Sequence, residues 1–176
     1  MKFAMKSIVA ATAFVAMGLA NAATVAIDGT NITGSGGLTF SSALQGALTL
    51  GGVTVGAYGG ATYASGTVTA GLSSLSYDTT TNKVTEVVST GGATQVMAAS
   101  SLLQATGGSA KVGDLDVKFN ADGSVNIYGI VSGTSNSGTA VNFSGLLFTV
   151  KATDITGATT FTNSVGTYNT TLSNLT

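Results

Sequence analysis

The chain has 176 residues, a formal net charge of −1 and only 7% charged residues, and it contains no cysteine, histidine, proline, tryptophan or arginine. Ordinary soluble domains carry roughly 25% charged residues, so the surface of this chain is short of charge. The missing side chains exclude a disulfide framework, Ser-His and Cys-His catalysis, and metal sites that need imidazole or thiolate.

The first 22 residues have the features of a secretory signal peptide. Lys2 and Lys6 accompany an uncharged, mostly apolar run at 8–19, and Ala20-Asn21-Ala22 places small residues where a signal peptidase cleaves. We expect cleavage after Ala22, a secreted or cell-surface protein, and no transmembrane segment in the mature chain. The alternative is a retained membrane helix, but the run is shorter than the roughly 20 residues that a bilayer requires.

Removing 22 residues from 176 leaves 154, the size of one domain with its own core. The mature part keeps 4 lysines and 7 acidic residues, so its net charge is −3. With so few dispersed lysines and no arginine, a nucleic-acid surface cannot be formed. Richness in Val, Ile and Thr favours folded β structure over disorder.

The first mature residues, 23–33, alternate apolar and polar side chains and predict a strand. The run 34–37 (Gly-Ser-Gly-Gly) predicts a flexible joint, so we divide the mature chain into an N-terminal strand with its joint over 23–37 and a β-sandwich domain over 38–176. Within that domain, 38–50 predicts a strand that turns at Gly51-Gly52 into a second strand over 53–58. A less regular strand follows over 62–72.

A polar turn at 78–83 separates two further strand patterns. After the strand at 84–89, the segment 94–105 carries Val96, Ala99 and Leu103 at helical spacing and ends before Gly107-Gly108, which predicts one short helix.

The segment 114–131 gives the clearest pattern in the chain. Leu115, Val117 and Phe119 alternate with charged residues, and a turn of Asn, Ala, Asp and Gly at 120–123 precedes a second alternating arm, which predicts an antiparallel hairpin. Beyond it, 140–152 carries apolar residues on both faces, which predicts burial from both sides. Strands at 160–165 and 168–175 complete the chain.

Short strands at roughly 8 to 12 residue spacing, joined by glycine turns, predict an all-β fold. We expect an antiparallel β-sandwich or jelly roll of roughly ten strands with one short helix.

Candidate chemical sites are few and have plain structural explanations. Asp114 and Asp116 lie about 7 Å apart on strand geometry, close to glycosidase separations, but their face is expected to be solvated. Asp78 and Asp122 lie in turns that lack the acidic density of a calcium loop. We predict no enzyme activity and no cofactor. Five tyrosines could stack on sugars, but scattered singly they are typical of half-buried strand positions: Tyr58, Tyr63, Tyr77, Tyr128 and Tyr168.

The shortage of charge is therefore the main functional indication. Weakly charged β structure without proline or edge lysines lacks the devices that prevent sheet edges from pairing with neighbours. This predicts an exported structural subunit that assembles with copies of itself into an extracellular filament, sheath or layer.

In its leader, its N-terminal strand and its β pattern, the chain resembles the donor-strand pilins and biofilm-matrix fibre proteins of bacteria, although it lacks the cysteine pair of chaperone-assembled pilins. The resemblance implies that the N-terminal strand completes the sheet of the next subunit; pairing within its own sheet is the alternative. The candidate assembly strand has Ala23, Val25, Ile27 and Ile32. The candidate subunit contacts are Val141, Phe143, Leu146, Leu147, Phe148, Leu172 and Leu175.

Two other functional classes remain open from the sequence. One is a monomeric adhesin or carbohydrate-binding β-sandwich, and the other is a small hydrolase that uses only carboxylates.

Overall fold

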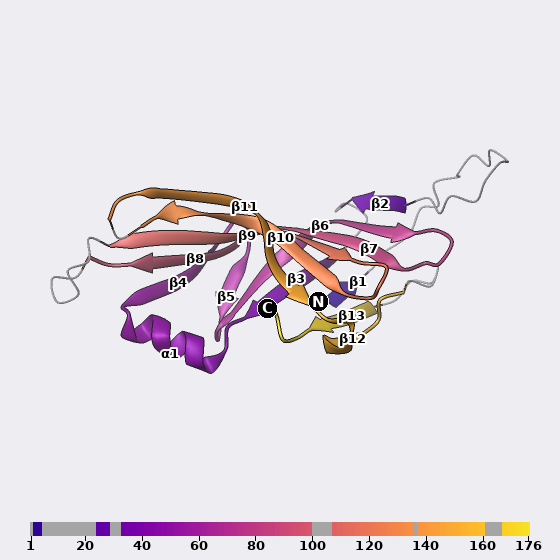
Figure 1. Cartoon of the computed structure of the whole chain (residues 1–176), viewed down its shortest axis with the longest axis horizontal. Helices are drawn as coiled ribbons and strands as arrows, with labels where there is room; N and C mark the ends of the chain where they lie inside the picture. The colour runs from indigo at the N-terminus through magenta and orange to yellow at the C-terminus, as the bar shows by residue number, and fades with distance from the viewer. Residues whose placement is uncertain (1, 5–23, 29–32, 100–106, 136, 161–166) are drawn as a thin grey trace.

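The computed structural model describes residues 2–4, 24–28, 33–99, 107–135, 137–160 and 167–176, and antiparallel strands dominate it (Figure 1). In chain order the elements are β1 (Lys2–Ala4), β2 (Thr24–Asp28), β3 (Thr33–Thr39), α1 (Ser42–Leu50), β4 (Val53–Tyr58), β5 (Thr62–Ala64), β6 (Thr67–Asp78), β7 (Val84–Thr90), β8 (Gly92–Met97), β9 (Gly108–Phe119), β10 (Val125–Thr134), β11 (Ala140–Val150), the 3-10 helix η1 (Ala152–Asp154), β12 (Ile155–Gly157) and β13 (Thr167–Leu172).

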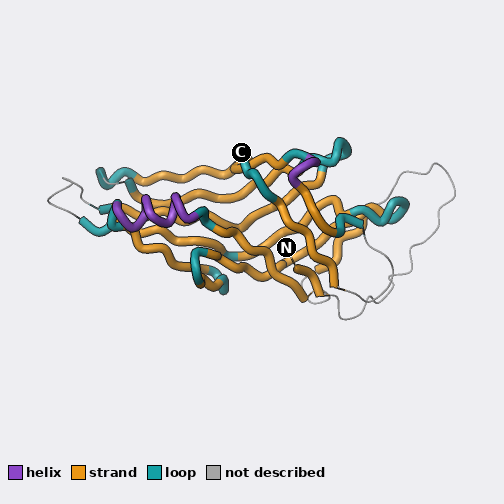
Figure 2. The backbone as a smooth tube through the Cα atoms, turned by 90° about the horizontal axis from the view of Figure 1, so that it is seen from below, coloured by secondary structure: helices purple, strands orange, loops and turns teal. Residues whose placement is uncertain are grey.

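The layer at the top of Figure 1, called the upper layer, is a sheet of long strands. These strands run along the long axis of the molecule (Figure 2). Strands β7 and β8 lie one after the other along the same edge of β9. Strand β2 pairs with β6, so the order β11-β10-β9-β7-β6-β2 forms a six-stranded antiparallel sheet at one end of the molecule. At the other end, β4 pairs with β8 and replaces β6 and β2.

The cross-strand register puts apolar residues in one row across this sheet. Leu75, Val87, Val117 and Ile127 are successive register partners on β6, β7, β9 and β10, and all four are almost completely buried. The next row, shifted by one residue, presents polar side chains on the opposite face, because side chains alternate along a strand.

The second layer covers the apolar face. Strand β3 pairs with β6 and β1, and β13 pairs with β1 and β12, which gives the order β3-β1-β13-β12. Ile155, Leu172 and Leu175 from this side pack against the core cluster. The predicted all-β fold with two layers and one short α-helix is confirmed.

The predicted hairpin at 114–131 is confirmed as β9 and β10. The Asn120 N–H donates to the Ser124 carbonyl at 2.8 Å, and the Gly123 N–H donates to the Asn120 carbonyl at 3.0 Å. Gly123 has a φ of +85°, which glycine adopts without steric cost.

The position predicted for the helix was wrong. Residues 94–97 belong to β8, which is held between β4 and β9, and residues 100–106 lie outside the described part. The helix is α1 instead, where a strand was predicted over 38–50. The Ser41 hydroxyl caps it by accepting from the Leu44 N–H at 3.2 Å, and Gly51 ends it. The strand at 53–58 is confirmed as β4, but its partner is β8.

The predicted flexible joint at 34–37 was also wrong, because these residues lie within β3. Gly36 and Gly37 are register partners of Ala70 and Thr69, so sheet pairing compensates for the entropy that glycine loses in a strand. The predicted leader contributes β1 at its start, and 5–22 lie outside the described residues. Of the strand predicted at 160–165, residues 161–165 lie outside them too.

The prediction that 140–152 is buried on both sides was wrong as well. Strand β11 is an edge strand, and both faces of its first five residues are exposed. Apolar side chains on both faces did not indicate a central position here.

The long strands bend where β7 meets β8. Gly91 has a φ of +80°, and a Cβ there would lie 2.4 Å from the Tyr58 carbonyl oxygen, so only glycine fits. Asp114 (φ +50°) holds the bend from β9: its carboxylate accepts from the Gly91 N–H at 2.9 Å, and its own N–H donates to the Gly91 carbonyl at 3.1 Å.

Replacing Leu75 with alanine should destabilise the fold strongly, because Leu75 is 1% exposed in the centre of the buried row. We expect a loss of about 2–5 kcal/mol in the free energy of unfolding, measured by urea denaturation. Leu50→Ala is the matched control, since Leu50 is 89% exposed and should change stability by about 0.5 kcal/mol or less. Similar losses in the two variants would contradict the placement of the core.

Removing residues 1–22 should expose backbone amides in the second layer, because β1 pairs with residues 33–35 on one side and 167–169 on the other. Hydrogen exchange should be faster at these two stretches in the chain 23–176 than in the full chain, while residues of β9 and β10 keep their protection. Unchanged exchange at both stretches would show that β1 is not part of this sheet in solution.

Candidate assembly edges

The outer edge of β11 is the most extensive unpaired edge of the upper sheet. Among the described residues β11 pairs only with β10, from Val125↔Val150 to Thr134↔Ala140. The edge is closed at one point, where the C-terminal residue makes two backbone hydrogen bonds: Thr149 N–H to Thr176 O at 2.7 Å and Thr176 N–H to Thr149 O at 3.1 Å. Backbone donors and acceptors over 140–148 therefore face outward without a strand partner among these residues.

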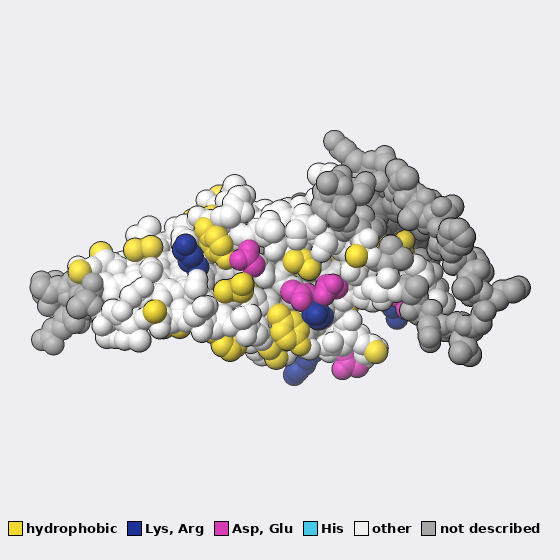
Figure 3. Space-filling model, turned by 90° about the horizontal axis from the view of Figure 1, so that it is seen from above, with side chains coloured by type: hydrophobic (Ala, Val, Ile, Leu, Met, Phe, Trp, Pro, Cys, Tyr) yellow, Lys and Arg dark blue, Asp and Glu magenta, His cyan; other side chains and the backbone are white. Residues whose placement is uncertain are grey.

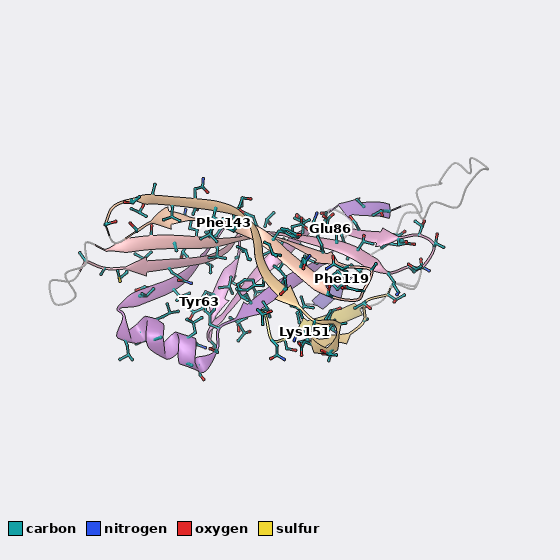
Figure 4. The ribbon with its side chains drawn as sticks, viewed as in Figure 1. Tyr63, Glu86, Phe119, Phe143 and Lys151 are labelled. Carbon is teal, nitrogen blue, oxygen red and sulfur yellow. The ribbon has the colours of Figure 1, made fainter. Side chains whose placement is uncertain are left out.

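Large apolar side chains gather along the same stretch. Phe143 is 49% exposed, and Val141 and Leu146 are each 46% exposed. Phe143 is a register partner of Val131, and Leu146 is a partner of Tyr128, so the two side chains lie on opposite faces of the sheet. Both faces beside the free edge are thus apolar, and Figure 4 shows Phe143 well separated from Lys151, which follows the strand. No charged residue occurs within β11.

The other predicted contact residues are not equally accessible. Leu147 is partly buried and lies near Gly129, where an added Cβ would be 2.8 Å from its Cδ1. Phe148, Leu172 and Leu175 pack against the core cluster. Their burial makes them parts of the subunit's own interior, so the accessible contact reduces to Val141, Phe143 and Leu146.

The candidate assembly strand lies at the opposite edge of the six-stranded sheet. Residues 24–28 form β2, and their register runs from Thr24↔Asp78 to Asp28↔Ser74 on β6. Pairing within the chain's own sheet, which the sequence left open, is therefore what the structure shows. Val25 and Ile27 lie in this strand, whereas Ala23 and Ile32 lie outside the described residues.

A small charged cluster occupies the outer face of the sheet between the two edges (Figure 3). The Lys118 ammonium lies 3.2 Å from Glu86 Oε1 and 3.3 Å from Asp116 Oδ2, and it lies 5.7 Å from the centre of the Tyr128 ring. Asp116 is more enclosed than the sequence predicted, with a side chain 29% exposed. Asp114 is exposed but serves the bend at Gly91, so these two carboxylates have separate structural partners.

The surroundings of this cluster shift the pKa of Asp116 and of Lys118. Desolvation raises the pKa of Asp116, an effect that the hydrogen bond with Lys118 partly offsets, and Asp116 Oδ1 is buried without a hydrogen-bond partner. Hydrogen bonds to Glu86 and Asp116 raise the pKa of Lys118. The lysine thus holds together two carboxylates that would otherwise repel each other.

The carboxylates of Asp78 and Asp122, the other candidate sites, have structural roles in turns. Asp78 accepts from the Thr80 and Thr81 N–H groups, each at 2.8 Å, and Asp122 accepts from the Ser124 N–H at 2.9 Å, so each carboxylate organises its own turn. The bond from the Thr81 N–H is the main cause that lowers the pKa of Asp78, and a second bond to Asp122, from the Ser124 hydroxyl at 2.6 Å, is the main cause that lowers the pKa of Asp122. Within the described segments, no group of three or more acidic residues could hold a metal ion, and no helix is long and apolar enough to cross a membrane.

Four of the five tyrosines have described side chains, and each of these has a neighbour within the subunit. Lys111 lies 5.6 Å from the centre of the Tyr58 ring, and Lys118 lies over Tyr128. Tyr77 packs against the core cluster around Leu75, and Tyr63 packs against a second buried cluster formed by Phe40, Val68 and Ala93 (Figure 4 labels Tyr63). The side chain of Tyr168 is outside the described part.

Sequence reasoning missed Ile130, which is 40% exposed on β10 beside Ser144 of β11. Its position in the alternation was the available signal, because Ile127, Gly129 and Val131 occupy the core face and Ile130 must point outward. It extends the apolar area around Leu146 on the outer face.

Comparisons of the chain with protein-family models, with curated proteins and with solved structures give no match.

Replacing Lys118 with methionine should make stability depend on pH in the acidic range. At pH 7 Lys118 is charged and pairs with both carboxylates, because its raised pKa lies far above that pH. Replacing Lys118 leaves Asp116 and Glu86 charged and close together. The deficit relative to the wild type should be largest at neutral pH and shrink as pH falls through the carboxylate range.

Urea denaturation at several pH values measures this deficit. Lys151→Met is the control, because Lys151 makes no ion pair within the described residues. A deficit independent of pH would show that Lys118 stabilises the fold by packing alone.

Proposed function

We propose that this protein is an exported structural subunit that assembles with copies of itself into an extracellular filament, sheath or surface layer by pairing sheet edges. The observation that carries the proposal is the unpaired stretch 140–148 of β11, which has no charge and exposes Val141, Phe143 and Leu146. Unpaired edges in soluble proteins are normally protected by lysine, proline, a bulge or a covering element.

Protection of this edge is confined to one of its ends. The register shift between Ile127 and Tyr128 opposes residues 146–148, and the Thr176 pairing closes the edge at Thr149. Residues 140–145 have neither device. An added strand would satisfy their backbone groups and bury the apolar side chains beside them, which are the two contributions that drive strand addition.

The composition supports the same function. A mature net charge of −3 over 154 residues gives little mutual repulsion between copies, and moderate salt screens it further. The predicted signal peptide supports export, which would place assembly outside the cell. The proposed partners are therefore other copies of this chain.

A lysine in the free edge should inhibit assembly. In Phe143→Lys, strand addition would remove a cation from water without a compensating partner and would place like charges near each other in every contact. The critical concentration for polymer formation should rise at least tenfold, equivalent to about 1.4 kcal/mol per contact. Sedimentation and electron microscopy of the chain 23–176 measure it.

Leu50→Lys is the matched control, because it changes an exposed leucine on α1 to the same residue away from the edge. Its critical concentration should remain that of the wild type. A wild-type chain that stays monomeric across salt and concentration, with no filaments in micrographs, would contradict the proposed function.

A further inference from the structure

We infer that β11 of one subunit pairs with the outer edge of β2 in the next, so that the assembly is one continuous antiparallel sheet. This inference rests on the proposed function and adds the identity of the second edge. It takes the second copy as the partner because β11 and β2 are edges on opposite sides of the same sheet.

Strand directions fit this arrangement without rotating the second copy. The order β11-β10-β9-β7-β6-β2 contains six strands, and each is antiparallel to its neighbour. With an even number of strands, the two edge strands run in opposite directions. A second copy in the same orientation therefore places its β11 antiparallel to β2 of the first. The register across the sheet aligns β2 with the end of β11 near Phe148, so the second copy must also be displaced along the strands to bring 140–145 beside β2. Each addition again leaves one such edge of each kind.

Such a contact joins two different surfaces and does not close on itself. Heterologous contacts of this kind generate open filaments unless the rotation between copies closes a ring. Pairing of β11 with β11 would instead use the same surface twice and stop at a dimer. The presence of two distinct free edges is what allows continued growth.

The apolar pattern restricts the register of the contact. On β11, Val141 and Phe143 are partners of Gly133 and Val131, on the face that continues the core side of the sheet. On β2, positions 25 and 27 are partners of Tyr77 and Leu75, which belong to the same face. Continuing that face across the contact places position 27 of β2 opposite Phe143 or Val141 in the register, whereas a slip of one residue would exchange the two faces.

The C-terminal residue limits the contact to one part of β11. Because Thr176 occupies the edge at Thr149, the added β2 must lie within 140–148. In the permitted registers, Ala26, which is exposed on the outer face, lies beside Ser144 or Asn142. These pairs can be tested directly, because the chain has no native cysteine.

The proposed contact keeps β2 in its own subunit. Its five register pairs with β6 remain intact, and the contact uses only the side of β2 that has no strand partner among the described residues. Donor-strand exchange, which the resemblance to pilins implies, would require β2 to leave β6. The two mechanisms therefore differ in whether β2 must be released.

Disulfide cross-linking tests the pairing. Chains 23–176 carrying Ala26→Cys are co-assembled with chains carrying Ser144→Cys, or with chains carrying Asn142→Cys, and then oxidised. We expect a disulfide-linked heterodimer in at least one mixture, because opposed strand residues lie within disulfide reach. Phe143→Cys is the matched control on the opposite face and should give at least tenfold less product with Ala26→Cys.

A second variant separates edge pairing from strand exchange. The double variant Ala26→Cys/Ser76→Cys joins two register partners of β2 and β6 in one chain. Oxidised before assembly, it should polymerise as its reduced form does.

The outcomes are distinct. Polymers that give no cross-link in either mixture, equal cross-linking by the Phe143→Cys control, or loss of polymer in the oxidised double variant would each overturn the β2 to β11 contact while leaving self-assembly intact. Absence of polymer in the wild-type chain would instead overturn the proposed function on which the contact rests.

Discussion

The register that aligns the upper strands is the constraint on which the rest of the structure depends. Leu75, Val87, Val117 and Ile127 form one buried row across four strands, and a slip of one residue in any of them would bring a polar side chain into the core. The second layer, the bend at Gly91 and the charged cluster around Lys118 are all placed by this alignment. The same alignment determines which side chains stand at the edges.

An open sheet must end in edge strands, which here are β11 on one side and β2 and β4 on the other, and their chemistry decides whether the protein remains alone. Strand β11 has no charged residue and is apolar on both faces, β2 has one charged residue, Asp28, at its end, and the ion pairs of Lys118 with Glu86 and Asp116 lie between the edges. The middle of the outer face is therefore suited to water and the edges are suited to contact. This division connects the unusual composition with the proposed assembly.

Local pattern predicted the parts of the fold that depend on neighbouring residues. The hairpin of β9 and β10 followed from strict alternation and the turn at Gly123. The helix could not be placed because Leu44 and Leu48 lie on one face of a strand as well as on one face of a helix. Residues 94–97 carry a helical pattern but are extended because β4 and β9 pair with them. Strand β11 was expected at the centre because sequence does not reveal which strand has only one neighbour.

The most direct measurement is a cryo-electron microscopy reconstruction of the material formed by the chain 23–176. The account predicts filaments with continuous antiparallel sheet across every subunit contact and about 29 Å per subunit measured across the strands, from six strands spaced about 4.8 Å apart. Subunits that contact each other through α1 or through the charged outer face, with β11 left unpaired, would contradict it.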